Sequence, residues 1–392
     1  MILIELLLDI LAIVMLVPVT VLSTQIILAL TVRRTGVVTG GRRPTVAILV
    51  PAHNETAVIG GTLAAINSQL LAGDRVLVVA DNCTDETAGF AGRSGAMVVE
   101  RNDVDRRGKG YALDFGMRHL QQSPTEVVIF VDADCQVETG AIDRLARLCV
   151  QTARPIQALY LMHSPEGAGL KAHIAEFAWL VKNQVRPLGF LRLGLPCQLM
   201  GTGMAFPWEL AAKMDLANGN IVEDMKLGID LALQGRAALF CPDAVVSGVF
   251  PLGEGAVKTQ RTRWEHGHLS MILLEVPRLV ASALVRGDMQ VFALALDLAV
   301  PPLALLVSLL ALIFALSVGM AMLGLSVTPL LLSTLALGLL SVSVLLAWRG
   351  WGRPVLTLTD LLSVPVYVLS KIPLYLQYLK HRQEEWIRTD RE

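Results

Sequence analysis

Charged residues are scarce in this chain: Asp, Glu, Lys and Arg together make up 17% of its 392 residues, while hydrophobic residues make up 54%. Soluble globular proteins carry roughly 25% charged residues. The shortage is uneven, because apolar residues concentrate toward the two ends and the middle carries an ordinary mixture of charge, glycine and proline. We therefore expect one soluble domain held between membrane segments.

Net charge is nearly absent as well, at a formal -1. A chain without a basic excess has no overall field that attracts nucleic acid, so we expect no nucleic-acid partner.

Cysteine is also sparse, with five widely spaced residues and no C-x-x-C pair. This spacing indicates neither a disulfide framework nor a zinc site, and it agrees with a reducing cytosol.

The first apolar run predicts a membrane-spanning helix. Residues 10–32 contain no formally charged side chain, and a run of about 20 apolar residues crosses a bilayer. Glu5 and Asp9 precede the run, whereas arginines follow it at positions 33, 34, 42 and 43. The positive-inside rule therefore puts the end that leads into the middle domain in the cytosol. A signal peptide, the alternative, would carry its positive charge before the apolar run. We expect an N-terminal transmembrane helix over residues 1–34.

Two further apolar runs predict a helical hairpin. Residues 298–316 and 329–347 are nearly free of charge and are joined by a short segment that contains glycine. Arg349 and Arg353 follow the second run, so the same rule returns the chain to the cytosol there.

The last apolar stretch, residues 355–378, is less regular. It contains Asp360, Lys371 and two prolines, and a basic tail over residues 379–392 follows it. If the stretch crossed the bilayer, this tail would lie outside, so we expect a broken or interfacial helix and a cytosolic tail. The C-terminal membrane region would then cover residues 288–378, in a multi-pass protein of the inner (cytoplasmic) membrane.

Short β-branched runs in the middle of the chain predict strands that are buried on both faces. They fall at residues 45–51, 75–81, 96–100, 126–134 and 156–162. Stretches between them have helical length and spacing, at residues 56–71, 84–94 and 109–121. This repeat predicts an α/β fold, a Rossmann-like, mostly parallel sheet wrapped by helices, in a cytosolic domain over residues 42–275.

Polar residues gather directly after three of these strands. They are His53, Asn54 and Glu55 after the first, Asp81 and Asp85 after the second, and Asp132 and Asp134 after the fourth. Any one of them alone is explained more simply as a helix cap. Because ligands of such sheets bind beyond the carboxyl ends of the strands, the three groups together indicate a site at that edge.

Asp132 and Asp134 form a D-x-D pair after an apolar strand. Two carboxylates placed in this way can hold a hard divalent cation such as Mg²⁺ or Mn²⁺, which can also bind a diphosphate. A turn-forming acidic pair is the simpler alternative for a D-x-D taken alone. Lys109, which stands between two glycines in RRGKGYAL, favours the phosphate interpretation, since its ammonium can neutralise a phosphate that approaches the backbone.

Two later segments add candidate catalytic residues. Glu223 and Asp224 begin a helical pattern, where a carboxylate either stabilises the helix or accepts the proton of an attacking hydroxyl. Gln260, Arg263 and Trp264 form a Q-x-x-R-W pattern. Arginine offers planar donors to a leaving diphosphate and tryptophan a flat face to a sugar. A basic helix near lipid headgroups is the alternative for this segment.

Seven motifs, in this order, resemble those of glycosyltransferase family 2. They are VPAHNE, ADNCTDET, RGKGYALDFG, VDADC, GTGMAF, VEDMKLGIDL and QRTRW, and the resemblance covers residues 45–271. They are most similar to the membrane-bound cellulose-synthase-like and ceramide-glucosyltransferase-like branch, which is marked by D, D-x-D, D and Q-x-x-R-W, and to bacterial exopolysaccharide enzymes. The resemblance implies a GT-A fold, a nucleotide-diphosphate donor of the UDP-sugar type, a Mg or Mn ion, and inversion at the anomeric carbon.

The resemblance also implies a role for each matching residue. Asp224 would be the general base and Asp134 the metal ligand. The donor would be held by Glu55, Asp81, Lys109, Asp132, Gln260 and Arg263. The acceptor would lie against Trp264, Gly201, Thr202 and Gly203. The family usually has two acidic residues after the second strand, but Ala80 stands here in place of the first, so the contact with the nucleotide base would rest on Asp81 alone.

These features together predict an inverting glycosyltransferase that passes a sugar to a lipid-linked or polysaccharide acceptor at the membrane, in cell-surface or exopolysaccharide biosynthesis. A processive polysaccharide synthase subunit with export partners is the alternative, although three or four spans hardly enclose a polysaccharide channel. A sugar nucleotidyltransferase would share the sheet and the acidic ligands but would not need Asp224 with Q-x-x-R-W. A non-catalytic membrane scaffold would not need intact acidic residues.

Overall fold

The computed structural model describes residues 2–32, 42–217, 222–251 and 253–380, which fall into two compact units. The sheet unit takes in Arg33–Pro165 and Leu195–Gln260. The helical unit takes in Met1–Val32, Glu166–Gly194 and Arg261–Gln383. The predicted tail, residues 379–392, lies outside the described residues except for its first two, so its location stays a prediction.

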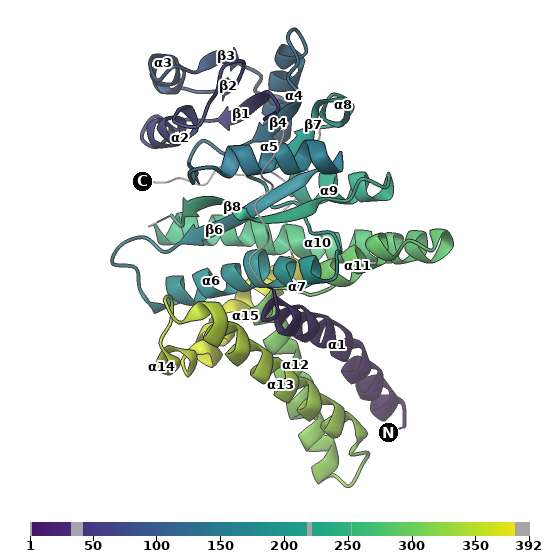
Figure 1. The fold of residues 1–392 in the computed structure, drawn as a ribbon. Coiled ribbons are helices and arrows are strands. Elements are labelled where there is room, and N and C mark those ends of the chain that lie inside the picture. The colour runs from purple at the N-terminus through teal and green to yellow at the C-terminus, as the bar shows by residue number, and fades with distance from the viewer. Residues whose placement is uncertain (1, 33–41, 218–221, 252, 381–392) are drawn as a thin grey trace. The chain divides into compact units, whose positions relative to one another are not determined.

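A single mixed sheet forms the centre of the sheet unit (Figure 1). Its strands are β1 (Val46–Ala52), β2 (Arg75–Asp81), β3 (Met97–Arg101), β4 (Val127–Phe130), β5 (Gln136–Val137), β6 (Ile156–His163), β7 (Met204–Pro207) and β8 (Leu239–Val249). They lie in the order β3-β2-β1-β4-β7-β6-β8-β5. Among the described residues, β7 pairs antiparallel with β4 and β6, and β5 with β8, while the other neighbours are parallel. The predicted α/β, mostly parallel sheet is confirmed.

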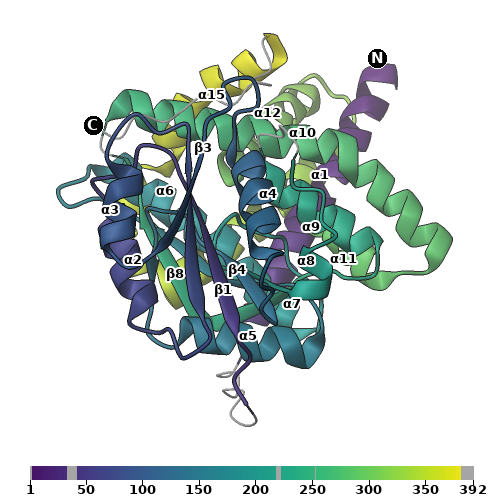
Figure 2. The same ribbon diagram turned by 90° about the horizontal axis from the view of Figure 1, so that it is seen from above.

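Helices cover both faces of this sheet. They are α2 (Ile59–Asn67), α3 (Thr87–Arg93), α4 (Lys109–Leu120), α5 (Ala141–Thr152), α8 (Trp208–Ala211) and α9 (Glu223–Leu233). Figure 2 shows α2 and α3 on one side of β1 to β3 and α4 on the other. Gly116 allows this close packing, because a Cβ there would lie 2.4 Å from Leu49 Cδ1 and 2.8 Å from Val79 Cγ2. The packing holds Lys109, the first residue of α4, at the carboxyl ends of the strands.

Apolar helices build the helical unit. They are α1 (Ile2–Ala29), α6 (Leu170–Leu180), the π-helical turn Val181–Val185, α7 (Arg186–Arg192), α10 (Glu254–Arg286), α11 (Met289–Leu298), α12 (Leu303–Met322), α13 (Thr328–Ala347), the π-helical turn Trp348–Gly352, α14 (Leu358–Leu361) and α15 (Val364–Lys380). Four described segments are long and apolar enough to cross a membrane: Leu3–Ala29, Gly255–Arg286, Leu303–Met322 and Thr328–Gly352. The second of these was not predicted as a span, because residues 255–275 were predicted to belong to the middle domain.

The first arm of the predicted hairpin is displaced along the chain. The sequence predicts it over residues 298–316, but α11 ends at Leu298 and α12 runs from Leu303 to Met322. Pro301 and Pro302 lie in the gap, and proline ends one helix and precedes the next because it lacks a backbone N–H. The second arm, α13, begins at Thr328 and ends at Ala347, close to the prediction.

A buried polar network ties α1 to α7 and α11. Arg186 Nη2 donates to Asp297 Oδ1 at 2.7 Å, Gln25 Nε2 donates to the same oxygen at 2.7 Å, and Arg186 Nε donates to Gln25 Oε1 at 3.2 Å. The helices come close enough for this because Gly189 has no side chain. A Cβ at this position would lie 2.0 Å from the carbonyl oxygen of Gln25. The first helix is therefore an integral part of the helical unit.

Candidate active site

Lys109 and Asp132 meet at the carboxyl edge of the sheet. Lys109 Nζ lies 2.5 Å from Asp132 Oδ1 and donates to the carbonyl oxygen of Gly201 at 2.7 Å. Burial disfavours the ammonium, but the charges of Asp132 and Glu223 outweigh this and raise the pKa of Lys109. The lysine is therefore a permanent positive charge beside the D-x-D pair.

The segment that carries Gly201, Thr202 and Gly203 is anchored to this pair. The fully buried Thr202 hydroxyl accepts a hydrogen bond from the backbone N–H of Asp132 at 3.0 Å. Gln157, also fully buried, donates to Thr202 O at 2.9 Å and accepts from the Met200 N–H at 2.8 Å. Gly201 and Gly203 have φ angles of +92° and +65°, a backbone region that favours glycine. The predicted acceptor segment and donor pair therefore form one hydrogen-bonded assembly.

Helix α9 brings two carboxylates to the same place. An added Cβ at Gly201 would lie 3.3 Å from Asp224 Oδ2 and 3.7 Å from Lys109 Nζ, so these groups surround the glycine. Glu223 precedes Asp224 in the first turn of α9. Burial raises the pKa of Glu223 to about 7; the Lys109 charge opposes this rise, and the Asp224 charge adds to it.

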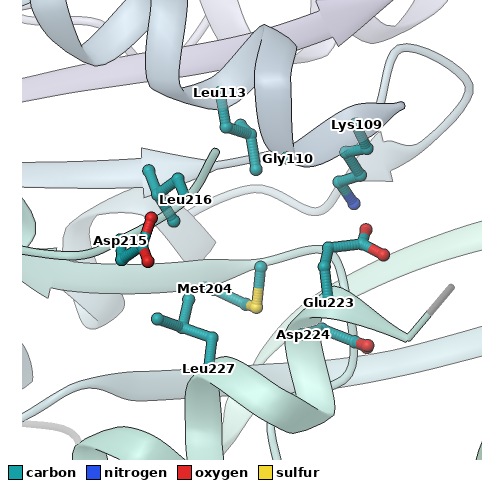
Figure 3. Close-up of a pocket in the computed structure, with 9 residues that line it drawn as sticks. All are labelled: Lys109, Gly110, Leu113, Met204, Asp215, Leu216, Glu223, Asp224 and Leu227. Atoms are coloured by element: carbon teal, nitrogen blue, oxygen red, sulfur yellow. The ribbon is translucent and has the colours of Figure 1, made fainter. Parts of the chain in front are cut away.

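These residues line a pocket with about 300 Å³ of empty space, part of which is open to solvent (Figure 3). Lys109, Glu223 and Asp224 lie together in its lining, and Asp215 adds a third carboxylate. The rest of the described lining is Gly110 and four apolar side chains. Asp224 and Lys109 therefore line the same small pocket.

Asp132, Asp134 and Cys135 can bring their ligand atoms within 4.8 Å of one another. Carboxylate oxygens suit Mg²⁺ and Mn²⁺. Burial, with the added effect of the Asp134 charge, raises the pKa of the Cys135 thiol well above its ordinary value, so that sulfur stays protonated and is a poor ligand for a hard cation. The donor set therefore fits a divalent cation held by the two carboxylates.

Asp81 lies at the end of β2, almost fully buried. Its Oδ1 accepts from Arg101 Nη1 at 2.6 Å, across the paired ends of β2 and β3. The loop after β1 contacts this region through His53, whose Nδ1 lies 2.6 Å from Asp81 O. Glu55 donates its backbone N–H to Thr87 Oγ1 at 2.8 Å. The loops after β1 and β2 are thus held together, with Glu55 and Asp81 in adjoining segments.

The Q-x-x-R-W residues lie on α10. Gln260, which belongs to the sheet unit, is 5% exposed and its Oε1 is buried without a hydrogen-bond partner among the described residues. Arg263 and Trp264 belong to the helical unit. There, the indole of Trp264 packs on that of Trp179 from α6, with ring centroids 4.7 Å apart. Their roles in binding the diphosphate and the acceptor stay predictions.

Several residues of the site escaped the sequence reasoning. Arg101 could have been found, because it ends the strand next to Asp81. Gln157 gave no signal, since a single glutamine in an apolar strand reads as an ordinary strand residue. Asp215 lies in an irregular segment with no recognisable pattern.

The comparisons with known proteins agree with this geometry. The model of the family "Glycosyltransferase like family 2" matches residues 44–267. An uncharacterized glycosyltransferase of Mycobacterium tuberculosis is 34% identical over 192 residues, which cover 45% of this chain and 82% of the relative. The probable glycosyltransferase YdaM of Bacillus subtilis is 27% identical over 255 residues, which cover 59% of this chain and 56% of that protein.

A solved structure shares the fold over nearly the whole chain. It is a mannosyltransferase from Pyrobaculum calidifontis, in complex with GDP-Man and Mn²⁺, with a TM-score of 0.58 and 17% identity. The similarity covers 96% of this chain and 100% of that one. This confirms the predicted GT-A fold with added apolar helices. Since the family model covers more than half of the sequence, the chain belongs to glycosyltransferase family 2 and is a glycosyltransferase.

Proposed function

We propose that this enzyme transfers a sugar from a nucleotide-diphosphate donor, of the UDP-sugar type, to a hydroxyl of an acceptor at the membrane, with inversion at the anomeric carbon. The acceptor oxygen forms a bond to the anomeric carbon while the bond from that carbon to the diphosphate breaks. The hydroxyl proton passes to the Asp224 carboxylate, and the nucleoside diphosphate leaves with the bonding electrons. A lipid-linked or glycan acceptor in cell-surface or exopolysaccharide biosynthesis is the setting that we favour.

The observation that carries this proposal is the convergence of Lys109, Asp132, Gly201 and Asp224. One lysine contacts the D-x-D carboxylate and the glycine carbonyl, and the same glycine lies against Asp224. A donor that is held at the D-x-D pair would therefore present its anomeric carbon near a carboxylate that can accept a proton. Lys109 supplies a fixed positive charge for the phosphates.

Asp132 and Asp134 would hold a divalent cation, Mg²⁺ or Mn²⁺. Such an ion would neutralise charge on the diphosphate as it leaves. The mannosyltransferase of the same fold contains Mn²⁺ and GDP-Man, which supports a metal-dependent reaction here. Asp81 would contact the nucleotide base from its pair with Arg101, and Gln260 and Arg263 would bind the diphosphate.

We further propose that the enzyme lies in the cytoplasmic membrane with residues 42–275 on the cytosolic side. Arginines follow the first apolar segment at positions 33, 34, 42 and 43, as the positive-inside rule requires for a cytosolic end. Nucleotide sugars are charged and stay in the cytosol, so a catalytic domain on that side meets its donor.

The test is release of nucleoside diphosphate by the purified full-length protein in lipid nanodiscs. UDP-, GDP- and dTDP-sugars are supplied in turn with Mg²⁺ or Mn²⁺ and a membrane lipid extract. We expect metal-dependent release from one donor, and a loss of at least a hundredfold in Asp224→Asn. Asp230→Asn is the matched control, because Asp230 lies on the same helix and pairs with Lys226. No release from any donor would favour a non-catalytic scaffold.

A further inference from the structure

Helices α1 and α13 lie side by side in the helical unit and run in the same direction. Ser343 Oγ lies 2.8 Å from Ser23 Oγ. A Cβ added at Gly350 would lie 3.3 Å from Leu30 Cδ2, so the next contact comes seven residues further along both segments, as in a parallel pair. Arginines at positions 33 and 34 follow α1, and arginines at positions 349 and 353 follow α13. The positive-inside rule therefore makes this shared end cytosolic.

The hairpin of α10 and α11 begins and ends at the same level. Asp297, the last residue but one of α11, accepts from Nε2 of Gln25, which lies four residues before the end of α1. His268 of α10 reaches this level too, because its Nε2 lies 3.4 Å from Leu298 O. The chain therefore leaves the cytosolic end along α10 and returns to it along α11.

The return path is too short for α10 to cross a bilayer. Gly255–Arg286 is long and apolar enough to span, but a crossing would leave Arg286 on the far side of a hydrocarbon core about 30 Å thick. The 10 residues of α11 rise only about 15 Å. The turn at Gly287 and Asp288 adds about 7 Å at full extension. In both views α10 runs across α1 instead of alongside it (Figures 1 and 2).

The outward face of α10 is nevertheless apolar. Its exposed apolar residues stand at positions 273, 274, 277, 281, 284 and 285. At 3.6 residues per turn, these positions fall within an arc of about 120° and form one stripe. The leucines and the valine of the stripe are between 62% and 88% exposed, and Met289 at the start of α11 is 68% exposed. Arg278 lies at the edge of the stripe and pairs with Glu275 at 3.1 Å. A stripe of this kind fits lipid chains, with the arginine at headgroup level.

We propose that the hairpin of α10 and α11 lies along the cytosolic surface of the membrane, with its apolar stripe among the lipid chains of that leaflet. The spans of the same unit bring the bilayer to this level, since α12 begins five residues after Leu298 and α1 ends beside Asp297. The chain then crosses the membrane with α1, α12 and α13, and α10 anchors it in the plane. This inference rests on the proposed membrane location and is independent of the transfer reaction.

The experiment measures the depth of two points on the stripe. Leu274→Cys and Val285→Cys are made in a Cys83→Ser protein, because the other four cysteines are buried. Each is labelled with bimane in phosphatidylcholine nanodiscs that contain a doxyl quencher near the headgroup or near the bilayer midplane. We expect the shallow quencher to be about twofold more effective at both sites. Leu312→Cys, an exposed position in the middle of α12, is the control and should show the reverse order.

Each other outcome overturns the inference. A crossing helix would place the two labels about 16 Å apart in depth, so opposite preferences for the two quenchers would show that α10 spans. Strong quenching at Leu312→Cys without quenching on the stripe would show that water or a second copy of the chain covers it. If Leu312→Cys is not quenched either, the proposed membrane location fails as well.

Labelling from outside the cell gives an independent readout. Met289→Cys, at the tip of the hairpin, and Leu323→Cys, between α12 and α13, are exposed to a membrane-impermeant maleimide on intact spheroplasts. We expect Leu323→Cys to react at least tenfold faster than Met289→Cys. Equal or faster labelling of Met289→Cys would place the tip outside and overturn the inference.

Discussion

Lys109 and Asp132 form an ion pair, with Nζ and Oδ1 2.5 Å apart, between the start of a helix and the end of a strand. Lys109→Met would leave the Asp132 carboxylate without its countercharge and remove the charge that we assign to the donor phosphates. Breaking a buried pair costs about 3–5 kcal/mol, and both side chains here are partly exposed, so we expect the lower value. Separately, the transition state loses one charge-assisted contact to the phosphates, and a loss of about 2.7 kcal/mol there lowers kcat/KM for the donor roughly a hundredfold.

Lys226→Met is the control for this change. Lys226 pairs with Asp230 on the surface of α9, with side chains 25% and 39% exposed. Surface pairs contribute about 0–1 kcal/mol, so we expect almost no effect on donor turnover. Equal losses in the two variants would contradict the assignment of Lys109 to the donor site.

Thr202 predicts a coupling between the acceptor segment and the D-x-D pair. Thr202→Val keeps the shape of the side chain but removes the oxygen that accepts from the Asp132 N–H. A buried donor left without a partner costs about 1–3 kcal/mol. We expect a rise in KM for the donor and lower thermal stability, both measured on the purified protein. Thr202→Ser retains the hydroxyl and should restore KM; a serine variant as impaired as the valine variant would contradict this role.

The parts of the fold that sequence reasoning found are those with strong local signals. The strands β1 to β4 and β6 are β-branched runs, and the polar residues after β1, β2 and β4 mark the ends of those strands. β7 was missed because it has four residues and ends at Pro207, and proline is unusual inside a sheet. β8 contains Pro242 and Asp243, where the register with β6 shifts, so it shows no regular alternation.

In the candidate site, too, sequence reasoning found only the residues that have a local signal. Lys109 and Asp132 were both recognised as phosphate-site residues, but their pairing depends on α4 packing against β1 and β2, a tertiary contact that has no local signature. The buried Gln157 and the ion pair between Asp81 and Arg101 likewise depend on neighbours in the sheet and not in the sequence. Spacing therefore identified groups of residues, and packing decided which of them meet.

Glu223 predicts a pH dependence of stability. Burial raises the pKa of this carboxyl from its ordinary 4.5 to about 7. The folded protein therefore binds this proton more tightly than the unfolded chain does. Its favourable contribution is complete below about pH 4.5 and is lost as the pH rises through about 7. Glu223→Gln has no proton to lose, so we expect its unfolding temperature, relative to the wild type, to rise between about pH 5 and pH 7.5.

Glu209→Gln is the control for this titration. Glu209 is an exposed carboxylate in the first turn of α8. The difference in unfolding temperature between this variant and the wild type should stay level across the same pH range. A level difference for Glu223→Gln as well would show that burial does not hold its proton.

Gly189 predicts a strict limit on side-chain size between α1 and α7. Gly189→Ala would place a Cβ 2.0 Å from the carbonyl oxygen of Gln25, so the helices must separate and strain the hydrogen bonds among Gln25, Arg186 and Asp297. We expect a loss of at least about 1–3 kcal/mol of stability, measured by thermal unfolding in detergent. Gly319→Ala on α12 meets no atom within 4 Å and should be neutral or stabilising. Similar losses in both would show that helix separation is not the cause.

The ion pair between Glu265 and Lys371 predicts that electrostatic attraction holds α15 against α10. Lys371 Nζ lies 2.5 Å from Glu265 Oε1, with side chains only 9% and 17% exposed. Lys371→Met should cost about 3–5 kcal/mol, because it leaves a buried carboxylate unpaired. Lys371→Met combined with Glu265→Leu removes both charges and should recover most of that loss. Thermal unfolding of the two single variants and the double variant gives the coupling energy directly.

The Glu265–Lys371 ion pair also explains how residues 355–378 accommodate Lys371. The charge of this residue was one reason to expect a broken or interfacial helix there. Its charge is matched inside the helical unit, while Val366, Leu369 and Leu376 on the same helix are more than half exposed. The helix therefore keeps its charged face inward and its aliphatic face outward, as a helix in contact with lipid requires. If the double variant were as unstable as Lys371→Met, the loss would come from packing, and the charge match would not be what holds α15 in place.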